Sequence, residues 1–131
     1  MNNNRLQHVK YPPLYQKALE LLSMSRSMSY VFGQDLINAA EHNLEHEKIY
    51  FTGDIIQQSY SLAPEILRAE NQPYAEDKKR YAQQVKLLTK KLFQTCDQLE
   101  NSPIKSKDFL SLFRKELRQF LKLQRTWTLM L

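Results

Sequence analysis

The sequence predicts an all-α fold, an antiparallel up-down four-helix bundle, from three observations. Only two of the 131 residues are glycine, Gly33 and Gly53, well below ordinary usage. Apolar residues recur at three- and four-residue spacing, which is the periodicity of amphipathic helices. No stretch of the sequence shows the alternation typical of a half-buried strand. Long helices joined by short connections bury such apolar stripes against one another in a bundle.

The chain has the length of one domain. We expect residues 1–11 to form a disordered N-terminal tail and residues 12–131 to form the bundle. Proline suits the first turn of a helix, so the pair Pro12-Pro13 predicts a first helix that begins near Pro13 and ends near Gly33. Residues 34–50 favour helix but contain few large apolar side chains. They are therefore expected to be a helical extension or an insertion.

Three further helices follow from the same periodicity. Thr52-Gly53-Asp54 indicates a break or a cap, after which Ile55 to Leu67 form the stripe of a second helix. A mid-helix proline lacks the amide donor and crowds the preceding turn, so Pro64 predicts a kink there. The third helix lies between Pro73 and Asn101, and the fourth begins near Ser106 or Lys107. The predicted core residues are Leu21, Leu88, Leu92, Phe113 and Leu117.

Several function classes are excluded by composition. With its two glycines twenty residues apart, the chain has neither a P-loop nor a dinucleotide fingerprint. Cys96 is the single cysteine, so there is no intrachain disulfide and no cysteine-rich zinc site. No apolar run approaches the roughly 18 residues of a membrane span. We expect a soluble protein of the reducing cytoplasm, without membrane contact, cofactor or catalytic residues.

The net charge of +5 conceals an uneven distribution. Residues 1–34 carry +3, residues 35–77 carry −7 and residues 78–131 carry +9. On the fourth helix, six cations share an arc of about 100° that contains no acidic residue. Such an arc suits phosphate contacts, although a solvated face or pairing with the acidic middle segment explains it equally well. The predicted nucleic-acid-binding residues are Lys107, Arg114, Lys115, Arg118, Lys122 and Arg125, with Lys79, Lys86 and Lys90 of the third helix.

The apolar arc of the fourth helix is unusually wide, about 180°, whereas one bundle core needs only about 100°. The surplus predicts an interface with another subunit or partner. The alternative is a deep helix that its own chain contacts on two sides. The predicted interface residues are Phe109, Leu112, Phe120 and Leu123.

One segment has the spacing of a zinc site. His42 and His46 enclose Glu45 in an H-x-x-E-H sequence, a pattern found in some zinc peptidases. A catalytic zinc also needs a third protein ligand and a cleft, and this segment is strongly acidic. A solvated helix face is the expected role, so no metal ligands are predicted.

Three segments and one tryptophan carry a resemblance to a known family. The opening of the first helix, from Pro13 to Leu22, resembles the start of small bacterial four-helix-bundle proteins. Ile66 to Glu70 resembles the end of their second helix, Val85 to Leu88 the middle of their third, and Trp127 a tryptophan near their C-terminus. These are the proteins encoded in intervening sequences of 23S ribosomal RNA genes and the accessory variability determinant (Avd) of diversity-generating retroelements. The resemblance implies a cyclic homo-oligomer, pentameric in Avd, that binds nucleic acid and a reverse transcriptase and has no catalytic activity.

We therefore expect a non-enzymatic bundle that binds nucleic acid without sequence specificity or serves as an accessory factor of a reverse transcriptase. The second hypothesis is an oligomeric protein-interaction module that has no nucleic-acid role and pairs its basic half with acidic partners. The third, a metal-dependent hydrolase, depends on His42 and His46 alone.

Overall fold

The computed structural model describes residues 9–41, 48–102 and 107–131 and contains four helices. They are α2 (Pro12–Glu41), α3 (Lys48–Glu70), α4 (Ala75–Glu100) and α5 (Lys107–Met130). No strand occurs within these described ranges. The all-α class and the four helices predicted from the sequence are thus confirmed.

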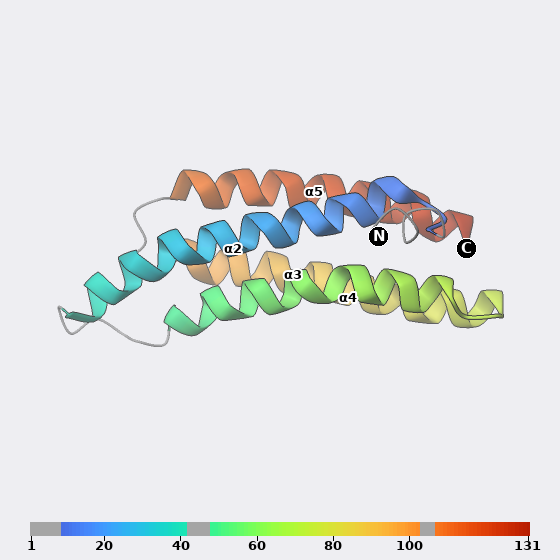
Figure 1. Cartoon of the computed structure of the whole chain (residues 1–131), viewed down its shortest axis with the longest axis horizontal. Coiled ribbons are helices and arrows are strands. Elements are labelled where there is room, and N and C mark those ends of the chain that lie inside the picture. Colours follow the sequence, from blue (N-terminus) through green and yellow to red (C-terminus); the bar gives the residue numbers. More distant parts are fainter. Residues whose placement is uncertain (1–8, 42–47, 103–106) are drawn as a thin grey trace, which may run out of the picture.

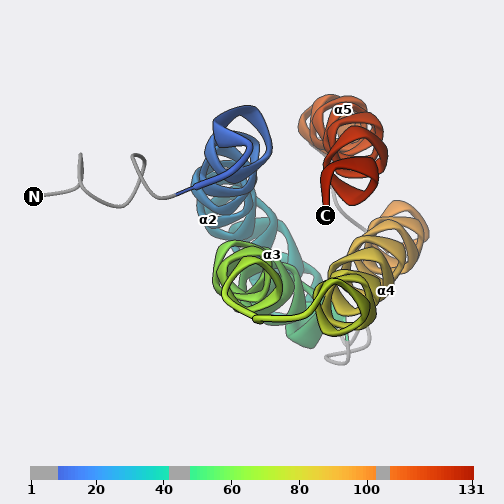
Figure 2. The ribbon, with the colours of Figure 1, turned by 90° about the vertical axis from the view of Figure 1, so that its right-hand side faces the viewer.

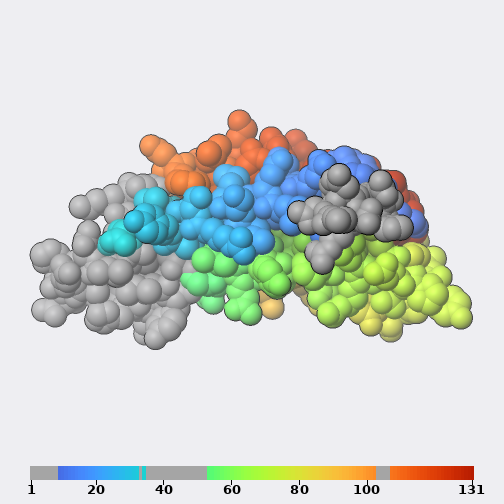
Figure 3. Space-filling view, in the orientation of Figure 1, coloured from blue at the N-terminus to red at the C-terminus, as the bar shows by residue number. Residues whose placement is uncertain are grey.

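The helices form a bundle in which α2 packs against α3 and α5, and α4 packs against the same two helices. The start of α2 and the end of α5 lie at the same end of the molecule (Figure 1). An end-on view shows the four helices arranged around a common centre, with α5 between α2 and α4 (Figure 2). On the face drawn in Figure 3, α2 runs between α5 and α3.

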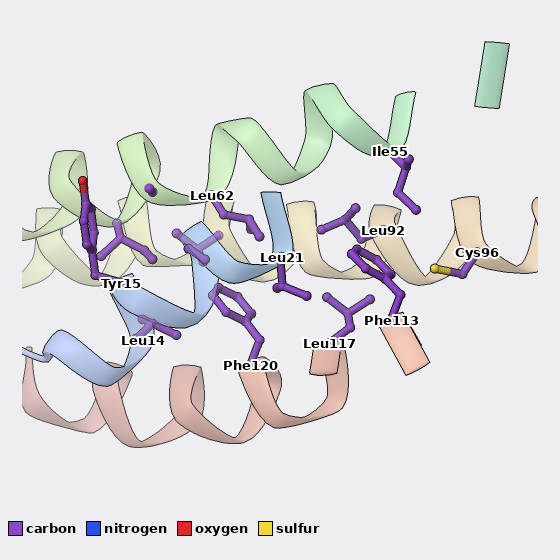
Figure 4. Close-up of a cluster of buried hydrophobic side chains, with 14 of the residues drawn as sticks. Leu14, Tyr15, Leu21, Ile55, Leu62, Leu92, Cys96, Phe113, Leu117 and Phe120 are labelled. Atoms are coloured by element: carbon purple, nitrogen blue, oxygen red, sulfur yellow. The ribbon is translucent and has the colours of Figure 1, made fainter. Parts of the chain in front are cut away.

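The core is apolar and receives side chains from all four helices, which point toward one another between the ribbons (Figure 4). Four of the five predicted core residues, Leu21, Leu92, Phe113 and Leu117, have no exposed surface. The fifth, Leu88, is only partly buried and packs at the edge of the core. The prediction of Leu88 as a fully buried residue is therefore wrong.

Thr89 occupies the buried position beside Leu88. Its hydroxyl lies 2.8 Å from the Val85 carbonyl oxygen one turn earlier, so a polar side chain is buried without an orphaned donor. The sequence prediction considered only apolar residues at helical spacing. It therefore assigned Leu88, and not the polar Thr89, to the core. The core face of α4 therefore differs from the predicted stripe at this turn, where Thr89 is buried and Leu88 lies at the edge.

Two helix boundaries differ from the sequence prediction. α2 continues through Gly33 to Glu41, and Gly53 lies inside α3 rather than at a break. A glycine inside a helix costs only about 1 kcal/mol relative to alanine, so it weakens a helix without ending it. α3 also contains Pro64 and continues on both sides of it. Residues 34–41 thus extend α2, and residues 42–47 lie outside the described residues.

The disordered tail predicted for residues 1–11 differs from the structure at its last three residues. Val9 is buried, Tyr11 is partly buried, and the backbone amide of Lys10 donates to Glu70 Oε1 at 3.2 Å. The apolar Val9 side chain gains from leaving water, and Glu70 accepts the nearby amide. Residues 1–8 lie outside the described part of the chain.

None of the helices in the described ranges combines the length and the apolar character that crossing a bilayer requires.

Candidate nucleic-acid interface

The basic arc of α5 lies opposite the face that packs into the core. The buried residues of this helix include Phe113, Leu117 and Trp127. Because successive residues of a helix are about 100° apart, the cations of the predicted arc are directed to the other side. Those with exposed side chains are Lys107, Lys115, Arg118, Lys122 and Arg125.

Arg114 is the exception in this arc. Its guanidinium forms two ion pairs with α4, at 2.7 Å to Asp97 Oδ1 and 3.0 Å to Glu100 Oε2. Only 23% of the side chain is exposed. Arg114 lies at the edge of the arc that faces α4, where its fork of donors satisfies two carboxylates. Arg114 thus joins α5 to α4, and its role as a phosphate-binding residue stays a prediction.

The opposite edge of α5 carries its other ion pair. Glu116 Oε2 accepts from Lys17 Nζ of α2 at 2.6 Å, and Lys17 also pairs with Glu20 at 2.8 Å. The hydrogen bond with Glu116, helped by the one with Glu20, raises the pKa of Lys17 above its usual value. Glu116 is thus directed toward α2 and away from the basic arc.

Three of the exposed cations lie close together in the middle of α5, and we call Lys115, Arg118 and Lys122 the outer cations. All three are exposed. None has an ion-pair partner among the residues that the structure describes. Like charges at this spacing repel by a few tenths of a kcal/mol, about 0.2–0.5 per pair. An anionic ligand would offset that repulsion.

Two of the three predicted cations of α4 lie on the side of α4 that faces α5. Lys79, Lys86 and Lys90 are exposed. Lys86 and Lys90 line a groove between α4 and α5, with Arg125 contributed by α5. The structure thus brings together cations that are about 35 residues apart in sequence, whereas Lys79 is not among the residues lining this groove.

Sequence reasoning missed the groove itself, which we call the α4–α5 groove. Its volume is about 680 Å³, within the usual range of ligand sites. Its apolar lining includes Leu87, Phe93, Leu121 and Leu129. Three of these residues, Leu87, Phe93 and Leu129, had no place in the predicted stripes, because their exposure to the groove depends on how α4 and α5 pack.

Most of the residues predicted for an oligomer interface pack within the bundle of the single chain. Phe120 has no exposed surface in the single chain, so its side chain belongs to the core. Phe109 packs edge-on against Phe32 of α2, with ring centroids 6.5 Å apart, and Leu123 is partly buried against the core. α2 and α4 contact α5 from two sides, which accounts for most of its wide apolar arc. Leu112 is the one predicted interface residue that remains half exposed.

The single cysteine and the two histidines of the H-x-x-E-H sequence are the remaining candidates for a catalytic or metal site. Burial of Cys96 raises the pKa of its thiol to about 12, against a smaller opposing effect of Arg114. A buried thiol of this kind is a small apolar group rather than a nucleophile. His42 and His46 lie outside the described residues. In the described ranges, no group of three or more His, Cys, Asp or Glu side chains is placed to hold a metal ion.

No protein-family model matches the chain, and no curated protein or solved structure matches it either.

Proposed function

We propose that this chain is a non-enzymatic nucleic-acid-binding accessory protein that contacts phosphates through the outer cations of α5. The observation that carries the proposal is the separation of charge on α4 and α5. Asp97 and Glu100 bind Arg114, and Glu116 binds Lys17. These three carboxylates are therefore paired with cations other than the outer cations, which stay exposed.

The geometry of the outer cations suits a phosphate backbone. Lys115 and Lys122 are seven residues apart on a continuous helix, which corresponds to about 10 Å along its axis. Phosphates of one DNA strand follow one another at about 3.4 Å along the duplex axis, so this row spans about three of them. Side chains of this kind position a nucleic acid without reading its sequence. Lys86, Lys90 and Arg125 widen the same basic side of the molecule.

The finer parts of the proposal come from the resemblance to Avd-type proteins and from the sequence pattern. They are an up-down bundle kinked at Pro64, a cyclic homo-oligomer and a reverse-transcriptase partner. The exposed Leu112 of α5 is available to a subunit interface. A reverse-transcriptase gene with a template repeat beside the gene for this chain would support the accessory role. The absence of such a neighbour would count against it.

Charge reversal of the outer cations tests the binding surface. Lys115→Glu with Arg118→Glu and Lys122→Glu should weaken binding to a duplex or a structured RNA at least tenfold, as measured by fluorescence anisotropy at about 50 mM salt. The matched control reverses three exposed cations elsewhere, Lys10, Arg26 and Lys91, so both variants have the same net charge. Equal losses in the two variants would show that net charge, and not this surface, governs binding.

A further inference from the structure

The lining of the α4–α5 groove combines apolar side chains with cations. Leu87 and Phe93 of α4 face the groove together with Leu121 and Leu129 of α5. Lys86 and Lys90 stand on the α4 side, and Arg125 stands on the α5 side. No carboxylate is among the described residues that line it. Its chemistry therefore favours a ligand that is apolar on one face and anionic on the flanks.

The groove exists because small or polar side chains lie where the two helices meet. Ala82 and Thr89 of α4 and Thr128 of α5 form part of its lining. The Thr89 hydroxyl is directed toward the Val85 carbonyl and toward Gln124 Oε1, 3.3 Å away. These groups are satisfied within the chain but are too short to fill the space between the helices. The seam is closed further along by Arg114 with Asp97 and Glu100.

The exposed leucines distinguish this groove from the phosphate-binding surface. Leu87 is 51% exposed and Leu129 is 88% exposed. A phosphate backbone gains nothing from contact with aliphatic side chains, whereas an apolar helix face gains from covering them. The outer cations, by contrast, lie on the solvent side of α5, on the face opposite its buried residues.

The length and direction of the groove suit a helix. Its α4 lining runs from Ala82 to Phe93, which is about three helical turns or 16 Å. It follows the seam between two adjacent helices and is open to solvent. Amphipathic helices dock into such grooves through apolar residues spaced three and four apart.

We propose that the α4–α5 groove docks an acidic amphipathic helix of a partner protein, with the leucine-type face against the apolar side chains of the groove and Glu or Asp flanks against Lys86, Lys90 and Arg125. Opposite charges on the two sides of the interface favour one orientation and reject basic helices. The inference does not depend on the outer cations, which carry the proposed nucleic-acid role, because none of them lines the groove.

The test uses a synthetic helical peptide about four turns long, with leucine at three- and four-residue spacing and glutamate and alanine elsewhere. Fluorescence anisotropy of the labelled peptide should show saturable binding to the full chain. A peptide with lysine in place of every glutamate should bind at least tenfold more weakly. Absence of saturable binding at about 1 mM protein, or equal binding of both peptides, would overturn the proposal.

Two groove variants locate the binding. Thr128→Phe fills the groove without changing charge, and Leu87→Ser with Leu129→Ser removes its exposed apolar rim. Each should weaken peptide binding at least tenfold, about 1.4 kcal/mol, while circular dichroism confirms that the helices are intact. Leu19→Ser, at an exposed leucine of α2 outside the groove, is the matched control. Equal loss in the control would overturn the assignment to the groove.

The variant with reversed outer cations separates the two proposals. It should lose duplex binding and keep most peptide binding, and the groove variants should show the opposite pattern. Displacement of the peptide by duplex DNA from the unchanged protein would place the groove within the nucleic-acid surface and overturn helix docking. Binding of dodecanoate in place of the peptide would assign the groove to a small amphiphile and overturn it as well.

Discussion

Glu70 connects four parts of the chain at one end of the bundle. Its Oε1 accepts from the backbone amide of Lys10, and its Oε2 accepts from the indole N–H of Trp127 at 2.9 Å. Its backbone carbonyl accepts from Lys78 Nζ at 2.6 Å. The last residue of α3 is thereby joined to the segment before α2, to α4 and to α5. Trp127 is otherwise fully buried, so its polar N–H depends on this one carboxylate.

We expect Glu70→Ala to lower the free energy of unfolding by about 1–3 kcal/mol, because it leaves a buried indole N–H without an acceptor. Urea denaturation followed by Trp127 fluorescence measures this change. Glu76→Ala, at an exposed residue in the first turn of α4, should cost less than about 1 kcal/mol. Equal effects of the two substitutions would refute the structural role of Glu70.

Cys96 should react slowly with thiol reagents while the chain is folded. Burial raises its thiol pKa from 9.0 to about 12, and the thiolate is the reactive form. The stabilisation from this group is present below pH 9 and is lost as the pH rises toward 12, where the unfolded thiol is already ionised. Alkylation by iodoacetamide at about pH 8 should become fast only when denaturant is added. Fast alkylation without denaturant would contradict the burial.

At the scale of the element, α4 provides a matched pair of leucines. Leu92 has no exposed surface, and Leu88 lies at the edge of the core. Leu92→Ala should destabilise the bundle by about 2–5 kcal/mol, through lost burial and a cavity. Leu88→Ala should cost less than half of that, since the site is already partly solvated. An equal or larger cost for Leu88→Ala in urea denaturation would contradict its place at the edge of the core.

Gly53 lies inside α3 with open space around the position of a Cβ atom. Gly53→Ala should therefore raise the free energy of unfolding by about 0.5–1 kcal/mol, because alanine lowers the conformational entropy of the unfolded chain and has the higher helix propensity. Thermal unfolding by circular dichroism provides the measurement. A lower melting temperature would show that α3 is interrupted at Gly53, as the sequence alone suggested.

The sequence predicted the elements better than their ends and faces. The strong periodicity of α4 and α5 located both helices, because apolar spacing reports directly on burial. Gly33 and Gly53 misplaced two boundaries, since a glycine's cost is smaller than the gain from continued packing. The ion pairs of Arg114 and the burial of Phe120 could not be predicted, because both depend on which helix lies beside each edge of α5. The groove was missed for the same reason.

At the scale of the whole molecule, the packing of α5 sorts its charges. Its edge toward α4 contributes Arg114 to two carboxylates, and its edge toward α2 contributes Glu116 to Lys17. What remains toward solvent is the row of outer cations, beside a groove with a partly apolar lining. A polyanion and an acidic helix would thus be bound by adjacent but distinct surfaces of one bundle.

The salt dependence of duplex binding tests the central proposal most directly. Each neutralised phosphate contributes about 0.9 to the slope of log affinity against log salt, so the three outer cations should contribute about 2.7 per chain. The unchanged protein should bind measurably at about 50 mM salt with at least this slope. The slope should fall by about that amount when Lys115, Arg118 and Lys122 are reversed. Absence of binding at low salt, or a slope that the reversal leaves unchanged, would contradict a phosphate-binding role for α5.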